Sequence, residues 1–406
     1  MRHDGHAHLG ILPERPHLWL MPDGSKPLTV TVLSAISEVG AAEWDECAGT
    51  ANPFIRHAFL LAMERSGSAS PQTGWTPRHL AARDGEGRLL AAAPLYLKSH
   101  SFGEYVFDWS WAQAYERAGG QYYPKLQCAV PFTPVTGPRL LVRPGEDGPR
   151  LRRVLAASMV DLARRLGVSS VHVTFPGGDE YEGLGEAGYL QRLGSQYHWT
   201  NPGYQSFDDF LGQLSSRKRK QIRKERDAVA RTGIRLSTLV GGDVKARHWD
   251  VFHAFYQAVV DRKWGRAYVS RAFFEELSAS ALADSVVLVW AEDGGEPLGA
   301  AFNMLGGDTL YGRTWGGGRH VDFLHFEACY YRALDFAIAQ GLARVEAGAQ
   351  GEHKVSRGYL PNATYSAHWI ADSRLAEPVA RYLVHERAMV TEDMASQTEE
   401  GPFRKG

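Results

Sequence analysis

Cysteine is scarce in this sequence, with three residues among 406, at Cys47, Cys128 and Cys329. Their number is odd, they stand far apart, and no CxxC spacing joins them. This pattern argues against a disulfide framework and against a cysteine-based metal site. It fits a compartment in which thiols stay reduced.

Long apolar runs are also missing. No stretch approaches the roughly 18 apolar residues of a membrane-spanning helix, and the first thirty residues lack the charged start and apolar centre of a signal peptide. We therefore expect a cytoplasmic protein that touches the inner membrane at most peripherally. Positive and negative charges nearly cancel, to −1 overall, so a nucleic-acid contact would need a local basic patch.

Three histidines near the start, His3, His6 and His8, resemble part of a metal site. In metallohydrolases such a motif follows the first core strand, whereas here no strand-like segment precedes it. We expect residues 1–27 to be a disordered tail, and we assign no metal to the functional site.

An internal repeat organises the rest of the chain. Gly-Tyr-Leu at 188–190, with His-Trp at 198–199, recurs 170 residues later at 358–360 and 368–369. Upstream, both copies have a helix-period segment followed by an alternating strand, and before that a glycine-bearing hairpin turn. Matched segments in one order indicate a duplication.

Each copy shows a strand, two helices, a hairpin, further strands, a helix and a strand, which is the order of the GNAT acyltransferase fold. We therefore predict an α/β, mixed α+β, fold of two tandem GNAT-like domains. The first domain is predicted at 28–205, the second at 206–390, and a disordered C-terminal tail at 391–406.

The first copy carries about 35 additional residues, rich in aromatic side chains, within an insertion at 99–138. Loops of this length are usually functional or packed as a lid. The alternative is an apolar plug between the copies. We expect Trp109 and Tyr123 of this insertion to contact substrate.

A basic helix is predicted at 215–232, because seven of the ten residues at 217–226 are cationic. A solvated face normally mixes acidic residues with basic ones, and this one has a single acid. We expect Arg217, Lys220 and Lys224 to line a groove for a phosphate-rich partner. Candidates are a tRNA acceptor stem, a pyrophosphate-linked lipid or coenzyme A.

A second polar cluster follows the last helix–strand unit. Acyl transfer to an amine needs a base for the ammonium proton, donors for the oxyanion and an acid for the leaving group. We assign Glu352 or His353 as the base, Lys354 and Arg357 as electrostatic stabilisers and Tyr359 as the acid. The first copy has no cation at the positions that match the lysine and the arginine, so the repeated fold does not explain these charges.

A glycine-rich segment at 312–320 precedes a predicted helix, and its amides, with Arg319, are candidates for holding phosphate. It lacks the Q/R-x-x-G-x-G/A run of ordinary GNAT enzymes, which argues against coenzyme A. If Lys354 lies outside the site, the next candidates are Glu327 and the loop 316–319.

Several longer stretches resemble a known family: residues 52–60, 94–108, 131–140, 215–226 and 348–360. Over roughly residues 30–385 the sequence is similar to the FemAB-like peptidoglycan-biosynthesis family.

The resemblance implies a doubled GNAT fold related to the Fem aminoacyltransferases, which build peptidoglycan cross-bridges from aminoacyl-tRNA. Those enzymes carry a lysine after an aromatic residue in a loop near their C-terminal end, which implies a role for Lys354, although His353 precedes it here. The helical arm of some Fem enzymes has no counterpart in this sequence.

We therefore expect a transferase that forms an amide by moving an acyl or aminoacyl group onto an amine, such as that of a small-molecule or lipid-linked cell-wall precursor. No tightly bound cofactor is expected, and the donor is either aminoacyl-tRNA or acyl-CoA. Two alternatives stay open at this point. One is a coenzyme A-dependent GNAT N-acyltransferase of a small amine, and the other is a non-catalytic double-GNAT binding module.

Overall fold

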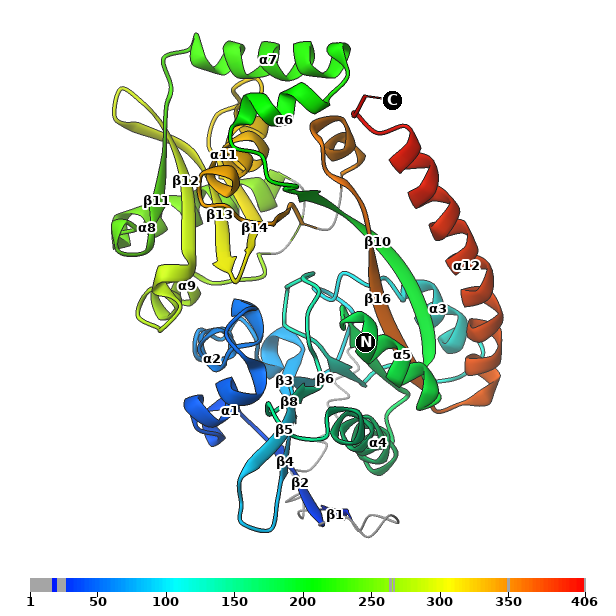
Figure 1. The fold of residues 1–406 in the computed structure, drawn as a ribbon. Helices are drawn as coiled ribbons and strands as arrows, with labels where there is room; N and C mark the ends of the chain where they lie inside the picture. The colour runs from blue at the N-terminus through cyan, green and yellow to red at the C-terminus, as the bar shows by residue number, and fades with distance from the viewer. Residues whose placement is uncertain (1–16, 20–26, 263–264, 266, 349–350, 405–406) are drawn as a thin grey trace, which may run out of the picture.

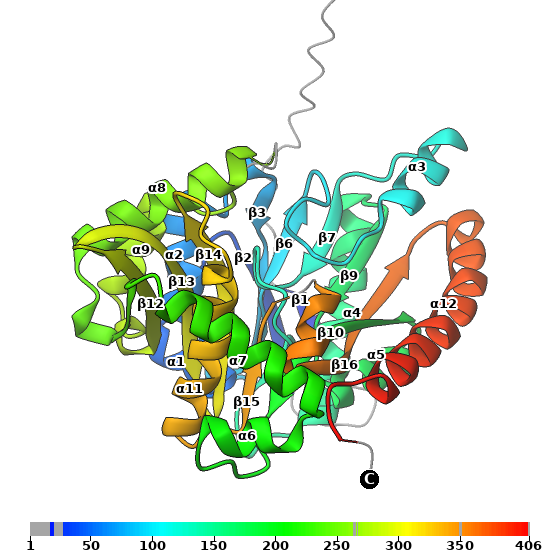
Figure 2. The same cartoon turned by 90° about the horizontal axis from the view of Figure 1, so that it is seen from above.

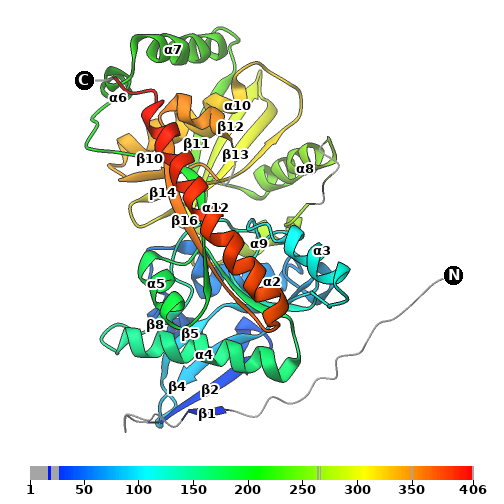
Figure 3. The ribbon, with the colours of Figure 1, turned by 90° about the vertical axis from the view of Figure 1, so that its right-hand side faces the viewer.

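The computed structural model describes residues 17–19, 27–262, 265, 267–348 and 351–404. Two halves lie next to each other, and the long strands β10 and β16 run between them (Figure 1). Helix α12 follows the same two strands along their length (Figure 3).

The first half contains, in chain order, β1 (His17–Trp19), β2 (Leu28–Leu33), α1 (Ala41–Ala48), α2 (His57–Arg65), β3 (Trp75–Pro77), β4 (His79–Arg83), β5 (Leu89–Ala93), β6 (Leu95–Lys98), α3 (Trp109–Arg117), β7 (Lys125–Cys128), β8 (Leu141–Val142), α4 (Gly148–Leu166), β9 (Ser170–Thr174), α5 (Gly178–Glu186) and β10 (Leu190–Thr200).

The second half contains α6 (Phe207–Gln213), α7 (Ser216–Ala230), β11 (Arg235–Val240), α8 (Ala246–Arg262), α9 (Arg271–Ser278), β12 (Val286–Asp293), β13 (Glu296–Gly306), β14 (Thr309–Gly317), α10 (Leu324–Phe326), the π-helical turn η6 (Glu327–Tyr331), α11 (Arg332–Ala339), β15 (Arg344–Glu346), the 3-10 turn η7 (Glu352–Arg357), β16 (Leu360–Ile370) and α12 (Ser373–Glu399).

Most strands of both halves join one continuous sheet, in the order β11-β12-β13-β14-β15-β10-β16-β9-β7-β6-β3. Two tandem domains would each have a sheet of their own, whereas here the main sheet extends across both halves. A smaller sheet, β1-β2-β4-β5-β8, completes the first half.

The two halves exchange their last strands. Strand β10 of the first copy pairs with β15 of the second, and β16 of the second copy pairs with β9 of the first. The two strands also pair with each other, antiparallel, with Gly194 opposite Thr364. These residues are counterparts in the 170-residue repeat, so a local two-fold axis passes between them. The repeat itself is confirmed, but the predicted boundary near residue 205 does not separate two independent sheets.

The two predicted tails differ from the structure where it describes them. Residues 391–399, expected to be disordered, form the end of α12. This helix packs on β10 and β16 through Leu375, Val379 and Leu383, which are buried. Within the predicted N-terminal tail, His17–Trp19 pairs with β2, and the histidine cluster of the first eight residues lies outside the described residues. None of the helices in the described ranges is long and apolar enough to cross a membrane.

Candidate active site

One face of the continuous sheet is polar and yet buried. Strand side chains alternate between faces, and the pairing register places one set of polar residues together across β7, β9, β16, β10 and β15. Its buried members are Lys125, Gln127, Ser170, His172, Thr174, Ser366, His368, Thr364, Gln196, His198 and Glu346. The opposite face carries apolar residues such as Val171, Val345 and Ala367. Buried polar groups are costly unless they are hydrogen-bonded, so this face is a candidate for function.

Glu346 and His198 face each other on this surface in the second half. They are directly paired residues of β15 and β10, both are about 5% exposed, and their Oε2 and Nε2 atoms are 3.8 Å apart. Within the described part of the chain, neither ring nitrogen of His198 nor Oε2 of Glu346 has a hydrogen-bond partner. Such unsatisfied buried groups require an explanation.

Burial controls the titration of this pair. It raises the pKa of Glu346 to about 7, against the opposing effect of nearby Arg344 and Arg313. Burial, together with the same Arg344 and with Lys354, lowers the pKa of His198 to about 3. His198 is therefore neutral near neutral pH, and Glu346 exchanges its proton there. A carboxylate with a pKa near the working pH is suited to general base catalysis.

A β-bulge brings Arg313 next to this pair. In the β13–β14 ladder Phe302 pairs with Thr314 and Asn303 with Gly312, so Arg313 is the additional residue. Bulges redirect a side chain and are common beside active sites. The Arg313 guanidinium donates through Nη2 to the Phe132 carbonyl at 2.6 Å, which links β14 to the insertion.

Arg313 also lines the interdomain cavity, a space of about 400 Å³ between the two halves. The other walls are mostly aromatic and come from α2, the insertion, α8, α9 and β14, including Phe59, Tyr105, Phe132, Tyr256, Tyr268, Phe274 and Trp315. The insertion thus forms part of a cavity wall, and it also packs against apolar residues, since Phe132 stacks on Tyr268 at 4.9 Å. Both interpretations of the insertion, as lid and as apolar plug, describe part of its contacts.

Among the cavities that adjoin this one, two contain residues of the polar face or of the predicted site. The strand cavity, about 200 Å³, lies on the polar face between β10 and β16 and shares Tyr105 with the interdomain cavity. The α10 cavity, about 590 Å³, shares Trp315 and His325 with it and is also lined by Arg319.

Backbone strain marks the same cavities. Four non-glycine residues of the described chain have left-handed φ angles, between 55° and 63°. They are Tyr105, Phe132, Phe175 and Phe323, and each lines one or two of the three cavities. Each such conformation costs about 1–3 kcal/mol and clusters at functional sites, so the strain favours a binding role for these cavities.

The predicted catalytic cluster does not stay together. Lys354 is buried, as expected, and its Nζ donates to the Gly348 carbonyl at 2.9 Å. Burial lowers the pKa of Lys354 to about 8. Glu352 and His353 are exposed, and the His353 ring bonds to the Tyr330 hydroxyl at 2.9 Å. Like Glu346 and His198, Lys354 lines none of the described cavities.

Arg357 and Tyr359 have structural positions. Arg357 Nη2 donates to both carboxylate oxygens of Glu225, at 3.0 and 2.9 Å, and both side chains are buried. Tyr359 is fully buried in an apolar core, and burial holds its pKa well above 10. A phenol in this environment does not release a proton readily, so this position does not support the predicted role of Tyr359 as an acid. Arg357 connects η7 to the basic helix.

The basic helix is confirmed as α7, but the groove is not. Helix α7 lies at the top of Figure 1 and nearest the viewer in Figure 2. Its Arg217, Lys220 and Lys224 are exposed and line none of the described cavities. Only Glu225 and Arg226 of the charged run turn inward, Arg226 to pair with Asp335 at 2.6 Å. No local pattern in the sequence separates these two residues from the outward cations.

The remaining predicted residues occupy separate places. Arg319 pairs with Asp293 at 2.6 Å at the rim of the α10 cavity. Trp109 packs on Phe102, with ring centroids 4.9 Å apart, and the Tyr123 hydroxyl bonds to Ser101. Glu327 is buried and paired with two arginines. None of Trp109, Tyr123 and Glu327 lines a described cavity.

Sequence reasoning missed Glu346, His198 and Arg313. The repeat held a signal for the first two, because His172 and His368 pair in the first half as Glu346 and His198 pair in the second. His198 and His368 are counterparts in the repeat, so Glu346 of the second copy stands where the first copy has His172. Arg313 lies in the glycine-rich segment 312–320, most of which forms β14, but its orientation depends on the bulge.

Solved structures show the same fold. FemX matches with a TM-score of 0.53 and 12% identity, over 84% of this chain and 98% of its own. L-PGS from Bacillus licheniformis matches at 0.50 and 11%, over 82% and 96%. The C-terminal domain of a putative lysylphosphatidylglycerol synthetase from Agrobacterium fabrum matches at 0.50 and 10%, over 86% and 97%. The predicted tandem GNAT-like fold is confirmed.

Sequence comparison gives the family. No curated protein sequence matches significantly. Residues 35–405, nearly the whole chain, match the model of the FemAB-like family, described as peptidoglycan biosynthesis/recognition. The resemblance noted from the motifs is thereby confirmed, and the chain belongs to the FemAB-like family.

Proposed function

We propose that the chain is an acyl- or aminoacyltransferase that forms an amide on an amine acceptor, with Glu346 as its general base. The observation that carries this proposal is the buried pair of Glu346 and His198, whose facing polar atoms have no partner within the described chain. An amine placed between them would donate hydrogen bonds to both. The family description supports a peptidoglycan precursor as the acceptor.

In this reaction the amine nitrogen attacks the carbonyl carbon of an ester or thioester donor. Glu346 takes the proton that the nitrogen loses as the C–N bond forms. The bond from carbon to the leaving oxygen or sulfur then breaks, and the proton passes to the leaving group. Arg313, beside Glu346 and at the wall of the interdomain cavity, supplies positive charge where the oxyanion develops.

The direct test is product formation. The purified chain is incubated with aminoacyl-tRNA or acyl-CoA and with amine acceptors that include a lipid-linked peptidoglycan precursor, and the product is analysed by mass spectrometry. An amide product supports the proposal and identifies the donor. Binding of these compounds without any amide product would instead favour the non-catalytic binding module.

The exposed cations of α7 favour aminoacyl-tRNA as the donor, because they form a polyanion-binding surface and not a closed site. We predict that replacing Arg217, Lys220 and Lys224 together with glutamine weakens tRNA binding and lowers the slope of log Kd against log salt by about 2–3. Binding is measured from 50 to 200 mM salt. An unchanged slope would contradict this surface as the tRNA site, and acyl-CoA in the α10 cavity would become the favoured donor.

Lys354 stays a candidate electrostatic residue, since it is buried and affects the titration of His198. We predict that Lys354→Met lowers kcat about 10²–10³-fold with little change in KM, because charge that acts on the transition state contributes to kcat. The unfolding temperature is measured alongside to separate this effect from loss of the Gly348 contact. Normal turnover by Lys354→Met would remove this lysine from the mechanism.

A further inference from the structure

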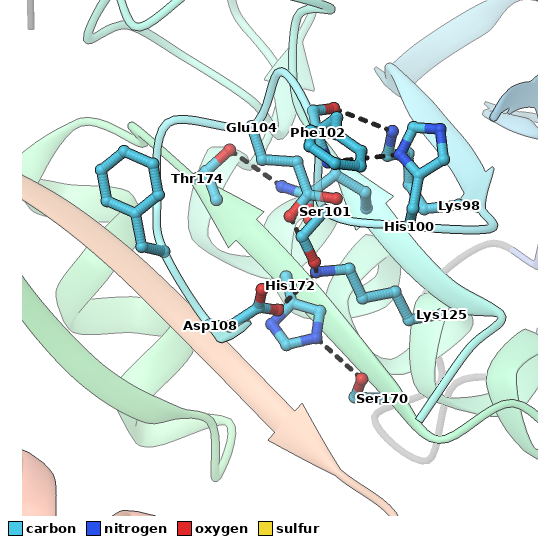
Figure 4. Close-up of polar contacts among 12 residues, drawn as sticks. Lys98, His100, Ser101, Phe102, Glu104, Asp108, Lys125, Ser170, His172 and Thr174 are labelled. Atoms are coloured by element: carbon cyan, nitrogen blue, oxygen red, sulfur yellow. Dashed lines mark hydrogen bonds and ion pairs between the residues drawn. The ribbon is translucent and has the colours of Figure 1, made fainter. Parts of the chain in front are cut away.

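The first half contains a buried cluster of charges that the proposed reaction does not use (Figure 4). Lys125, on β7, is fully buried. Its Nζ donates to Ser101 Oγ at 2.8 Å, to Glu104 Oε2 at 2.7 Å and to Asp108 Oδ2 at 2.5 Å. An ammonium group has three N–H donors, so all three are committed.

All three acceptors come from one irregular segment, residues 101–108, which we call the limb. It connects β6 to α3 and has no strand or helix of its own. The limb is otherwise solvent-facing in part, since Phe102 and Phe107 are 57% and 56% exposed. The three hydrogen bonds from Lys125 thus hold the start, the middle and the end of the limb against the sheet.

Tyr105 lies between two of the residues that Lys125 holds, Glu104 and Asp108. It immediately follows Glu104, it has a strained φ of 60°, and its side chain lines both the interdomain cavity and the strand cavity. The two cavities differ in character. The interdomain cavity is mostly aromatic with one arginine. The strand cavity combines the apolar residues Val106, Phe107 and Phe175 with a row of polar residues from β10 and β16, namely Arg192, Ser195, Gln196, Thr364, Tyr365 and Ser366.

A buried ion pair is a poor choice for stability alone, because apolar replacements of similar volume are often as stable or more so. It does fix the geometry of the groups it joins. Asp108 illustrates this, because its Oδ2 also accepts from the Tyr122 hydroxyl at 2.7 Å, which fixes the far end of the limb to the segment before β7.

We infer that Lys125 is a positioning residue that holds the limb so that Tyr105 forms the partition between two substrate chambers. The aromatic interdomain cavity receives one substrate, and the polar β10 and β16 side of the strand cavity receives a group with amide or hydroxyl hydrogen-bonding partners. Release of the limb would displace the partition and admit water to the donor. This inference rests on the proposed transferase function for its kinetic consequences, but not for its structural ones.

The test compares Lys125→Met with the native chain in two experiments. In hydrogen exchange without substrate, amides of residues 101–108 should exchange about tenfold faster or more, while β9 and β16 stay protected. In the transfer assay, kcat/KM should fall about 10²-fold, as expected for misplaced substrates, and the ratio of donor hydrolysis to amide formation should rise.

Two further variants keep the test decisive. Ser101→Ala removes one of the three hydrogen bonds from Lys125 without leaving an unpaired buried carboxylate. It should therefore give a smaller increase in limb exchange and in the hydrolysis ratio, even if Lys125→Met folds poorly. Glu180→Gln alters a buried carboxylate of the same half that binds the Arg139 and Leu140 amides, away from the limb, and it should affect stability but neither limb exchange nor the hydrolysis ratio.

Unchanged exchange of the limb in both Lys125→Met and Ser101→Ala would overturn the inference. The exchange experiment needs no substrate. Absence of transferase activity would therefore count against the proposed function, but the exchange result would still test whether Lys125 holds the limb. Faster limb exchange with an unchanged ratio of donor hydrolysis to amide formation would show that Lys125 holds the limb, and it would contradict the role of Tyr105 as a partition.

Discussion

Glu346→Gln is expected to lower kcat/KM for amide formation about 10²–10⁴-fold, the range associated with loss of a general acid–base group. Glutamine keeps the size and the hydrogen-bonding capacity of the side chain but cannot accept the amine proton. Because the pKa of Glu346 is raised to about 7 and the base acts in its deprotonated form, activity of the native chain should rise with pH through about 7. His198 is neutral over this range and adds no second step, whereas loss of the Lys354 charge, with a pKa of about 8, should lower the activity again above pH 8.

The measurement is a profile of kcat/KM from pH 5.5 to 8.5 for both proteins. The residual activity of Glu346→Gln should lack the rising limb near pH 7. Glu352→Gln is the matched control, since Glu352 is exposed on η7, and it should behave like the native chain. If Glu352→Gln loses activity and Glu346→Gln does not, the base assigned from the sequence is restored.

Arg357→Met is expected to destabilise the fold by about 3–5 kcal/mol, because it leaves the buried Glu225 carboxylate without its bidentate partner. The Tyr331 hydroxyl and the Gln221 amide still donate to Glu225, but neither carries a charge. For 406 residues, an unfolding entropy of about 2.1 cal/mol/K per residue means that this loss lowers the unfolding temperature by roughly 4–6 °C. Thermal unfolding followed by circular dichroism measures it.

Two variants make this result specific. Arg223→Met, on α7 near Glu225, breaks an exposed ion pair with Asp208 and should lower the free energy of unfolding by well under about 1 kcal/mol. Combining Arg357→Met with Glu225→Leu removes both charges and should recover most of the lost stability. A catalytic role for Arg357 would instead appear as lost turnover in a protein that unfolds at the native temperature.

Much of the local structure followed from the sequence. The first domain is predicted to begin at residue 28, where β2 begins, and the helix predicted over the basic run is α7. Periodicity, turn residues and charge are local properties, so they determine where elements begin and end. The duplication was also readable, because repeated residues such as those at 188–190 and 358–360 occupy equivalent turns before β10 and β16.

The candidate active site could be predicted only in part from the sequence, for a physical reason. Lys354, Arg357 and Tyr359 are close in sequence, but successive side chains in a short turn point in different directions. One bonds to a backbone carbonyl, one to a helix far away in the sequence, and one enters an apolar core. Sequence proximity therefore did not produce a common site.

The sequence by itself determined the repeat, the mixed α+β elements and the family, because each depends on local pattern. The tertiary structure alone decided how the two copies join, since strand exchange depends on backbone pairing that any sequence with β propensity can make. That exchange puts His198 of the first copy against Glu346 of the second. The candidate active site is thus a product of the pairing between copies, and neither copy contains it alone.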